Sequence, residues 1–283
     1  MLPVLLAFAS MVCAAANDVV FKVYANKRSP VGPYILVIGL LWAAIFGVLM
    51  YLYESGLNYN TVLWGAISGT FGVTANLLLV QTMKQMEMGI CATVYRMNLI
   101  PAAIVAVLFL NEDLSLWKLA GLVAAVLAVL LFFKRTDKAG ASAGVLPWCM
   151  LILACFLRAG MGLTYKWGMI EGASLYGLLC INGLAWILGG LIYWFGLESR
   201  MDARNHMILN HGALSGVLTA GIVLFLGKAL RDGDASLVLP LAQLSFLPTC
   251  IVGIILLKEG ASPRKLAGMF MAVGCIACMA MST

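Results

Sequence analysis

Ten apolar stretches, each close to the length that a helix needs to cross a bilayer, follow one another through nearly all 283 residues of the chain. A membrane-spanning helix needs about 20 mostly apolar residues. The predicted spans are residues 2–21, 33–53, 61–82, 89–110, 116–134, 146–168, 174–196, 208–228, 236–257 and 264–281. The connections between them are short, so the sequence predicts an all-α membrane protein without a separate soluble domain.

The composition excludes most other classes of protein. Apolar residues make up 63% of the chain and charged residues only 11%, whereas a soluble domain has about 25% charged residues. One water-soluble core cannot bury so much apolar surface, which excludes a soluble enzyme, a disordered protein and a nucleic-acid-binding domain. The net charge of +6 does not indicate nucleic acid, because no basic run exceeds two residues.

The chain shows no pattern for a metal, a cofactor or a cleaved leader. Cys275 and Cys278 form a C-x-x-C inside an apolar stretch, without a second pair of ligands, and His206 and His211 lie near a loop. Residues 1–16 are apolar and alanine-rich but lack the basic region of a signal peptide. We therefore expect no cofactor and no metal, and we expect residues 1–16 to remain as the first helix.

The second half of the chain repeats the first. A shift of 147 residues aligns residues 65–69 with 212–216, Pro101 with Pro248, Glu112 with Glu259, and 118–121 with 265–268. A shift of 144 residues aligns Lys22 with Lys166, Trp42 with Trp186, and Glu54 with Glu198. The sequence therefore predicts one five-helix repeat in residues 1–138 and a second in residues 139–283.

An odd number of spans in each half has a topological consequence. Because five is odd, the second half enters the membrane from the opposite face, so the two repeats are predicted to be inverted around a central cavity. Inverted repeats place a binding site near the bilayer midplane, and alternating access follows when one half rocks against the other. This arrangement favours a secondary transporter.

These features resemble the drug/metabolite transporter superfamily, EamA type. The residues that carry the resemblance are Pro101–Phe109, Asn111–Ser115, Lys118–Gly121, Pro248, Lys258, Glu259 and Lys265–Gly268. The resemblance implies a ten-helix bundle that moves a small metabolite, amino acid, sugar, nucleotide sugar or toxic compound. Glu112 and Glu259 resemble acidic residues that family members carry at this junction. We favour helix capping and packing there, with Ser115 and Ser262 as N-caps, over a role in transport.

Positive charge collects at one end of the predicted bundle. Loops between odd and even spans hold twelve basic residues, namely Lys22, Lys27, Arg28, Lys84, Lys134, Arg135, Lys138, Arg200, Arg204, Lys258, Arg264 and Lys265. The other end holds four, namely Lys118, Lys166, Lys228 and Arg231. The positive-inside rule then places both termini outside the cytoplasm, although the resemblance implies cytoplasmic termini. The expectation common to both is that the two termini share one side.

Three charged residues inside predicted spans need a partner or a function, because ionisable groups are costly in a membrane. Asp18 and Arg96 are predicted at similar depth, where they can form an ion pair, and Arg158 lies near the middle of its span without an acid at its depth. In the structural alternative, Arg158 caps backbone carbonyls and the pair is static. In the functional alternative, which we favour, these residues line the cavity and bind substrate.

Further polar and aromatic residues share these spans. The repeat aligns Arg96 with Gln243 and Asn98 with Ser245, so the fourth and ninth spans are predicted to line one cavity. Core packing and a cavity wall are both open readings for Trp42 and Trp186. The predicted substrate-binding residues are Arg158, Arg96, Asp18, Asn98, Gln243, Asn17, Tyr95, Trp42 and Trp186, with Asp18 as the candidate for proton coupling.

One Asp against two Arg leaves the predicted cavity net positive. This charge favours a secondary transporter of a small anionic or zwitterionic metabolite, such as an amino acid or organic acid. The alternative is a multidrug or cation exporter of the same fold. We expect no enzymatic activity, since no catalytic motif is present. The expected partners are a small-molecule substrate and the lipid bilayer, in a bacterial inner membrane, without nucleic acid; a monomer suffices and a dimer is compatible.

Overall fold

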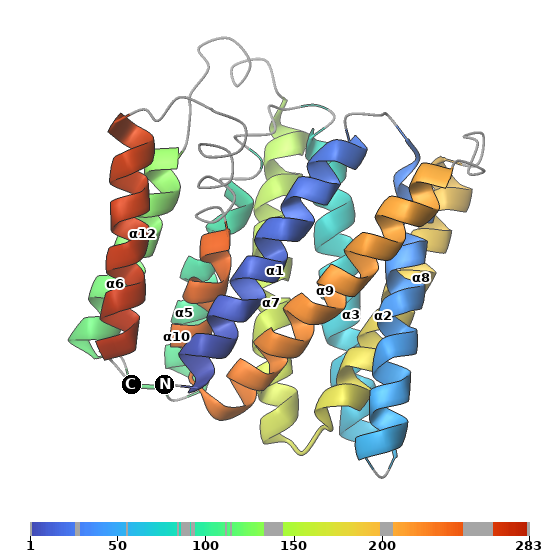
Figure 1. Cartoon of the computed structure of the whole chain (residues 1–283), viewed down its shortest axis with the longest axis horizontal. Coiled ribbons are helices and arrows are strands. Elements are labelled where there is room, and N and C mark those ends of the chain that lie inside the picture. The colour runs from blue at the N-terminus through green and yellow to red at the C-terminus, as the bar shows by residue number, and fades with distance from the viewer. Residues whose placement is uncertain are drawn as a thin grey trace.

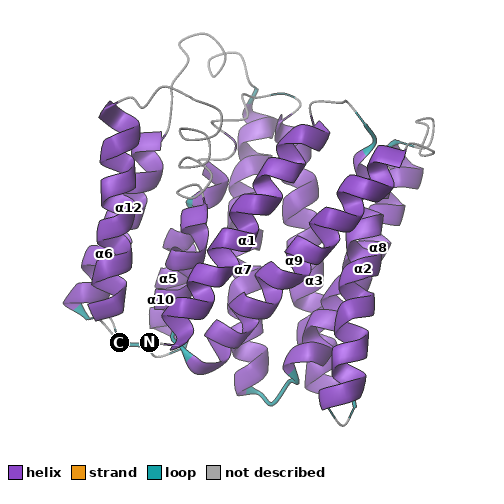
Figure 2. Ribbon diagram, in the orientation of Figure 1, coloured by secondary structure: helices purple, strands orange, loops and turns teal. Residues whose placement is uncertain are grey.

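The structure is a computed structural model in which the described secondary structure is entirely helical (Figure 2). It describes residues 2–25, 29–54, 56–83, 85, 91, 94–110, 112–113, 115–132, 144–198, 206–245 and 263–281. Its helices are α1 (Leu2–Ala25), α2 (Val31–Tyr53), α3 (Tyr59–Met83), α5 (Leu99–Phe109), α6 (Leu116–Phe132), α7 (Val145–Ile170), α8 (Leu175–Leu197), α9 (His206–Asp232), α10 (Ala235–Ala242), the 3₁₀ turn η1 (Gln243–Ser245) and α12 (Pro263–Met281).

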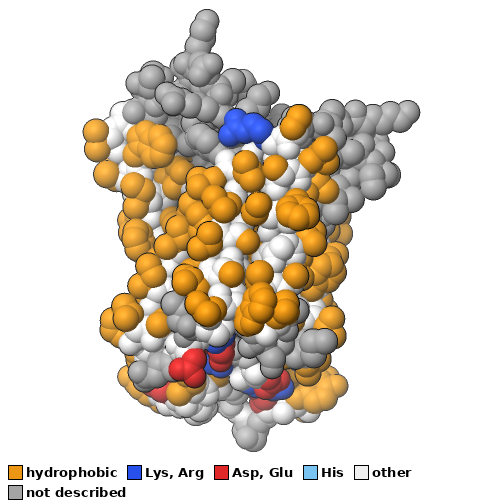
Figure 3. Space-filling model, turned by 90° about the vertical axis from the view of Figure 1, so that its left-hand side faces the viewer, with side chains coloured by type: hydrophobic (Ala, Val, Ile, Leu, Met, Phe, Trp, Pro, Cys, Tyr) orange, Lys and Arg blue, Asp and Glu red, His pale blue; other side chains and the backbone are white. Residues whose placement is uncertain are grey.

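Six of these helices are long and apolar enough to cross a membrane, namely α1, α2, α3, α7, α8 and α9. They confirm six of the predicted spans, and four shorter apolar helices coincide with parts of the other four. Large apolar side chains such as Leu188, Ile192 and Phe270 are exposed on the sides of the bundle. On the side shown in Figure 3, hydrophobic side chains cover the middle and charged ones lie toward the ends. The chain is therefore built as an integral membrane protein.

The predicted spans at residues 89–110 and 236–257 are described only in part, because residues 89–90, 92–93 and 246–257 lie outside the described residues, and the described parts are not uniform α-helix. Helix α5 has only 11 residues, or about 16 Å at 1.5 Å per residue, against about 30 Å for the hydrocarbon core. A turn at residues 97–98 precedes it, and Pro101 lies in its first turn, where proline is tolerated. Helix α10 likewise ends in η1 at Gln243–Ser245. The 147-residue shift places residues 96–98 on 243–245, so both interruptions occur at equivalent positions.

The helices pack in a pattern that relates the two halves. Helix α2 packs mainly on α8, α6 on α12 and α5 on α10. Helix α3 packs on α7 and α8, while α9 packs on α1 and α2. The counterparts in the two halves are α1 and α7, α2 and α8, α3 and α9, α5 and α10, and α6 and α12. When each helix is exchanged for its counterpart, the first three contacts map onto themselves and those of α3 map onto those of α9. Both ends of the chain lie at the same end of the bundle, as predicted (Figure 1); we call this the terminal end.

Two repeat-related glycine pairs bring α3 close to α8 and α9 close to α2. A Cβ added at Gly69 would lie 2.6 Å from Cβ of Ala185 on α8, and one added at Gly216 would lie 2.9 Å from Cβ of Leu41 on α2. Their partners Gly65 and Gly212 are equally crowded. Small residues at such places let helix backbones approach in lipid. These pairs are therefore packing seams, as their G-x-x-x-G spacing predicts.

Helices α2 and α8 also cap one another. The Glu54 carboxylate, at the end of α2, accepts hydrogen bonds from the backbone N–H groups of Tyr176 and Gly177 at 2.9 Å each, at the start of α8. The Glu198 carboxylate, at the end of α8, accepts one from the N–H of Gly32 at 2.8 Å, at the start of α2. Each carboxylate therefore satisfies backbone donors that a helix start leaves unpaired.

Candidate functional site

A small central cavity lies where the first and second halves of the bundle meet. Its volume is about 10 Å³, and residues from α5, the α7 centre, α9, α10 and η1 line it. Asn98, Arg158 and Gln243 are its polar lining residues, and Ala102, Ala159, Met161, Gly162, Leu226 and Leu239 form the rest of the wall. Three of the predicted site residues thus meet at one place. A single water molecule needs about 10–15 Å³, so the cavity has no room for a substrate in this conformation.

Arg158 projects from the middle of α7 into this wall. Among the described residues, its guanidinium makes one hydrogen bond, from Nη1 to Sδ of Met161 at 3.2 Å, and no ion pair. A thioether is a weak acceptor. The described contacts therefore do not support the structural alternative, in which Arg158 caps backbone carbonyls.

Asp18 and Arg96 form the predicted ion pair. Nη2 of Arg96 lies 2.7 Å from Oδ2 of Asp18, and the side chains are 19% and 43% exposed, respectively. Nη1 of Arg96 also donates to the backbone carbonyl of Gln243 at 3.0 Å and to Oγ of Ser245 at 2.5 Å. Arg96 thereby joins α1 to η1, directly behind the cavity wall.

These contacts bring together residues that the repeat makes equivalent. Arg96 and Gln243 correspond under the 147-residue shift, and so do Asn98 and Ser245. In the structure Arg96 contacts both Gln243 and Ser245, and Asn98 and Gln243 line the same cavity. The two interrupted helices therefore face one another across the cavity, as their sequence correspondence predicts.

The remaining predicted residues are buried donors and acceptors near this region. The rings of Trp42 and Trp186 pack at a centroid distance of 5.2 Å. Both indole N–H groups, the hydroxyl of Tyr95 and Oδ1 of Asn17 are buried and lack a hydrogen-bond partner within the described part of the chain. Buried polar groups of this kind usually have partners, so each unpaired one requires an explanation. Neither tryptophan lines the cavity itself.

Sequence reasoning missed two components of the site. One is Met161, which follows Arg158 by one helical turn and carries no signal of its own in an apolar helix. The other is a buried polar chain in which the amide of Asn182 donates to Tyr165 at 2.9 Å and to Ser68 at 3.1 Å, joining α8 to α7 and α3. The spacing of four residues between Asn182 and Trp186 places both on one face of α8, which is the signal that was available.

A polar cluster at the terminal end joins the α5–α6 connection to the α9–α10 connection. Lys118 on α6 forms an ion pair with Asp234, and its ammonium also donates to the carbonyl of Asp113 at 2.8 Å. Lys166 on α7 donates to the carbonyl of Gly233 at 2.8 Å. The Glu112 carboxylate accepts hydrogen bonds from two N–H groups at the start of α10, at 2.7 and 2.8 Å. We call these residues the terminal cluster.

The capping role predicted for the Glu112 region agrees with this geometry. Oγ of Ser115 accepts a hydrogen bond from the N–H of Lys118 at 3.2 Å, as an N-cap of α6. Glu112 caps α10 rather than its own neighbour α6, which sequence spacing alone does not indicate. Glu259 and Ser262 lie outside the described residues.

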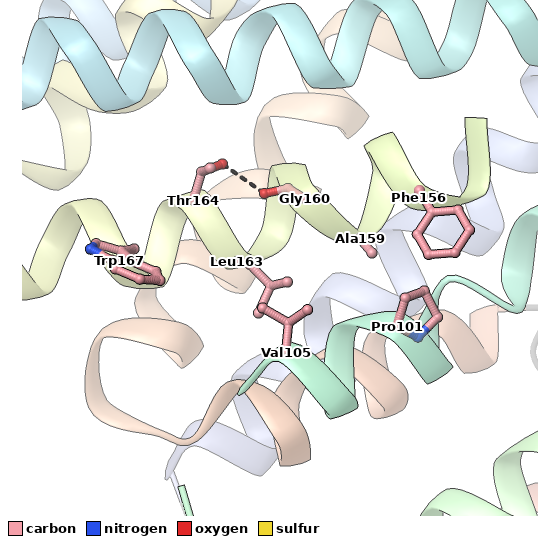
Figure 4. A pocket seen from close by; sticks show the side chains of 8 residues that line it. All are labelled: Pro101, Val105, Phe156, Ala159, Gly160, Leu163, Thr164 and Trp167. Atoms are coloured by element: carbon pink, nitrogen blue, oxygen red, sulfur yellow. Dashed lines mark hydrogen bonds between the residues drawn. The ribbon is translucent and has the colours of Figure 1, made fainter. Parts of the chain in front are cut away.

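An apolar groove runs between α5 and α7 on the other side of Ala159. Pro101 and Val105 face α7 residues from Phe156 to Trp167 across it (Figure 4). The hydroxyl of Thr164 is satisfied within α7, where it donates to the carbonyl of Gly160 at 2.8 Å. Phe156 is 59% exposed. The residues that line the groove are therefore mainly apolar, and none of them is charged.

Comparison with known proteins agrees with this architecture. Residues 1–134 match the EamA-like transporter family. A crystal structure of another protein superposes with a TM-score of 0.82 at 12% sequence identity, over 99% of this chain and 96% of that one, which shows a shared fold. No curated protein sequence matches the chain significantly. The family match agrees with the resemblance seen in the sequence: this is an integral membrane protein whose residues 1–134 match the EamA-like transporter family.

Proposed function

We propose that this chain is a secondary active transporter of a small anionic or zwitterionic metabolite, of the amino acid or organic acid class. The observation that carries the proposal is the contrast between the two arginines at the central cavity. Arg96 is paired with Asp18, whereas Arg158 has only a thioether as hydrogen-bond acceptor among the described residues. A buried charge without an anion is costly. A substrate carboxylate at Arg158 removes that cost, because guanidinium binds carboxylates through two parallel hydrogen bonds.

A zwitterion is also compatible with this proposal, because α1 carries two acceptors where Asp18 contacts Arg96. Oδ1 of Asn17 is buried without a partner in the described part of the chain, and Asp18 follows it on α1. An amino acid whose carboxylate binds Arg158 would need such acceptors for its ammonium group. Asp18→Asn separates the two cases: amino acid binding is lost and organic acid binding is retained if Asp18 receives the ammonium.

Transport is proposed to proceed by alternating access between ten helices arranged as two inverted repeats. The exchange of helix contacts between the halves, the reciprocal caps at Glu54 and Glu198, and the equivalent interruptions near Asn98 and Gln243 support the inverted repeat. Discontinuous helices at a midplane site are a recurrent feature of transporters with such repeats. In this scheme the terminal cluster holds the terminal end of the cavity closed.

Opening of the terminal end then requires the Lys118–Asp234 pair to break. Lys118→Gln is expected to favour the open state and to raise labelling of a cysteine placed at Ala102, on the cavity wall, by a membrane-impermeant maleimide applied from the terminal side. Lys228→Gln, a charge removal on α9 outside the cluster, serves as the matched control. Equal labelling in the two variants would contradict the assignment of the terminal cluster as a gate.

Proton coupling is proposed to act through Asp18. Protonation of its carboxylate would break the pair with Arg96, which also holds Gln243 and Ser245 of η1, so the proton would release a contact beside the cavity. Uptake into proteoliposomes should therefore rise with an imposed pH gradient and lose that dependence in Asp18→Asn. A wild-type rate that is unchanged by the gradient would refute proton coupling.

The alternative is a multidrug or cation exporter of the same fold, for which the aromatic pair Trp42–Trp186 is the supporting feature. A thermal-shift screen of the purified chain separates the two functions, because a ligand that binds only the folded state raises Tm. The panel holds L-glutamate, L-alanine, succinate, benzoate, choline and ethidium. Stabilisation by the carboxylates that is lost in Arg158→Gln, with Arg158→Lys intermediate, supports the proposal. Stabilisation by the cations alone, equal in Arg158→Gln, would establish the alternative.

We place the chain in a bacterial inner membrane as a monomer, since one copy contains both halves that form the cavity. Size-exclusion chromatography with light scattering in detergent tests the oligomeric state. Loss of carboxylate-induced stabilisation on dilution, in parallel with dissociation of a larger species, would show that a second copy is required.

A further inference from the structure

The acceptor that now holds Arg158 is a poor match for a guanidinium. The Sδ atom of Met161 accepts its hydrogen bond at 3.2 Å, and Met161 is 2% exposed. Hydrogen bonds to guanidinium are strongest from carboxylate or phosphate oxygens, and a neutral sulfur supplies little of that energy. Methionine has three rotatable bonds and repacks easily. Met161 is therefore the group in the wall that an incoming anion displaces most easily.

A second donor lies beside the same sulfur atom. Trp186 is 6% exposed, and its indole N–H has no acceptor among the residues that the structure describes. A Cβ added at Gly72 of α3 would lie 2.8 Å from Sδ of Met161 and 3.2 Å from Nε1 of Trp186. The sulfur and this indole N–H therefore both lie close to Gly72, and the guanidinium of Arg158 contacts the same sulfur.

The size of the cavity requires such a displacement. At about 10 Å³ it holds no more than one water molecule, and Met161 is one of its lining residues. Movement of the Met161 side chain vacates the space between the guanidinium of Arg158 and the indole N–H of Trp186. Gly72 leaves this space free of a side chain on the α3 side.

We propose that Met161 is a placeholder for the substrate anion. The substrate carboxylate takes the position of the Met161 sulfur and accepts hydrogen bonds from the Arg158 guanidinium and from the Trp186 indole N–H. Trp186 is thereby a specificity-determining residue for carboxylates, and Gly72 sets the room available to them. This inference rests on the proposed transport of an anionic or zwitterionic metabolite, and it assigns that substrate a second, neutral donor.

Substitution of Trp186, compared with substitution of a tryptophan outside the cavity, tests the inference. The probes are L-glutamate, L-alanine, succinate and benzoate, titrated against the purified full-length chain in detergent by isothermal calorimetry. Trp186→Phe keeps the aromatic ring and removes the N–H, and it is expected to weaken carboxylate binding about tenfold, the equivalent of one hydrogen bond. Trp117→Phe on α6 is the matched control, since Trp117 is 46% exposed and lines neither the cavity nor the groove, and binding should stay within about twofold of the wild type.

Substitutions of Met161 and Gly72 test whether the anion takes the position of the Met161 sulfur. Met161→Leu removes the competing acceptor at similar size, so carboxylates should bind with equal or higher affinity. Gly72→Ala places a methyl group where the anion is proposed to bind; its nearest neighbour is the flexible end of Met161, so the chain should fold while binding is lost. Thermal unfolding of each variant without ligand verifies folding.

A spectroscopic readout keeps the test decisive if Trp186→Phe does not fold. In the wild-type chain labelled with ¹⁵N-tryptophan, the Trp186 indole proton should shift downfield on carboxylate addition while the signal of the exposed Trp117 stays in place. Unchanged carboxylate affinity in Trp186→Phe, or an unmoved Trp186 signal in the saturated wild type, overturns the placeholder inference. If Arg158→Gln binds carboxylates as the wild type does, or no probe binds the wild type, the proposed function itself fails.

Discussion

Two partly buried arginines near the central cavity, Arg96 and Arg158, are held in different ways. Arg96 donates to Asp18, to the carbonyl of Gln243 and to Ser245, with distances of 2.5–3.0 Å. Arg158 donates to Met161 alone among the described residues. The first arrangement links α1 to η1 and completes the hydrogen bonding of a cation. The second leaves most of the five N–H donors of an arginine without an acceptor in the described part of the chain.

The difference shows that a charged side chain in an apolar bundle can have two roles. It can hold helices together when it has a partner in the protein, or it can bind a ligand when it does not. A buried charge that has its anion stabilises the packing of helices only as long as both partners are present. A buried charge without a counter-ion in the protein lowers the stability of the fold, but it can still bind a charged ligand. The same type of residue therefore serves the fold at position 96 and, in our proposal, the substrate at position 158.

Arg96→Gln should have the largest effect on the ligand-free protein. It removes three hydrogen bonds from one charged donor, to Asp18, to Ser245 and to the carbonyl of Gln243, and we expect a loss of about 3 kcal/mol in the free energy of unfolding. Thermal unfolding in detergent measures it, with Arg158→Gln as the paired variant, for which we expect a change below about 1 kcal/mol. Equal losses in the two variants would remove the contrast on which the proposal depends.

Arg158→Gln should have its main effect on ligand-induced stability. A carboxylate present at about 100 times its Kd stabilises the wild type by about 2.7 kcal/mol, and we expect nearly all of this gain to be lost. The measurement is the Tm shift with and without succinate. Arg158→Lys, which retains the charge but not the planar guanidinium, should keep part of the shift; full retention in the glutamine variant would contradict anion binding at Arg158.

The two reciprocal carboxylate caps should differ in strength. Glu198→Gln is expected to cost about 2 kcal/mol, because Glu198 is 4% exposed and a charged acceptor for the start of α2 is lost. Glu54→Gln should cost about 1 kcal/mol, because its site is more open to solvent. Chemical unfolding of both variants compares them. A larger loss for Glu54 would show that the number of N–H donors, not burial, determines the strength of these caps.

Lys118→Gln should have the smallest effect on stability. Its partner Asp234 is 48% exposed, so we expect a loss of about 0.5 kcal/mol. Its effect should instead appear in the open and closed populations of the terminal end, read by cysteine labelling at the cavity wall. A loss as large as that of Arg96→Gln would show that the terminal cluster holds the fold together and is not a gate.

Several features of the site could be predicted from the sequence. The pairing of Asp18 with Arg96 was predicted from their similar depth in two spans of opposite direction. The proximity of Arg96 and Asn98 to Gln243 and Ser245 was predicted from the repeat. The prediction that the G-x-x-x-G pairs lie at close helix contacts was also confirmed. These predictions succeed because the length and direction of a membrane helix follow from hydrophobic length alone.

Other features depend on contacts that no local pattern encodes. The spans predicted at 89–110 and 236–257 are interrupted at equivalent positions, and Glu112 caps α10, a helix that begins more than 120 residues later. Met161 and Gly72 carry no polar signal, and only their positions around Arg158 and Trp186 make them relevant.

The sequence by itself determined the class of the protein, the position of most helices, the correspondence between its halves and the residues that carry buried charge. These follow from the free energy of transfer into lipid, which depends on each segment alone. The tertiary structure decided which buried charge has a partner. That outcome depends on ångström-scale distances between side chains on different helices, because hydrogen bonds and ion pairs lose their strength within a few ångströms of misplacement.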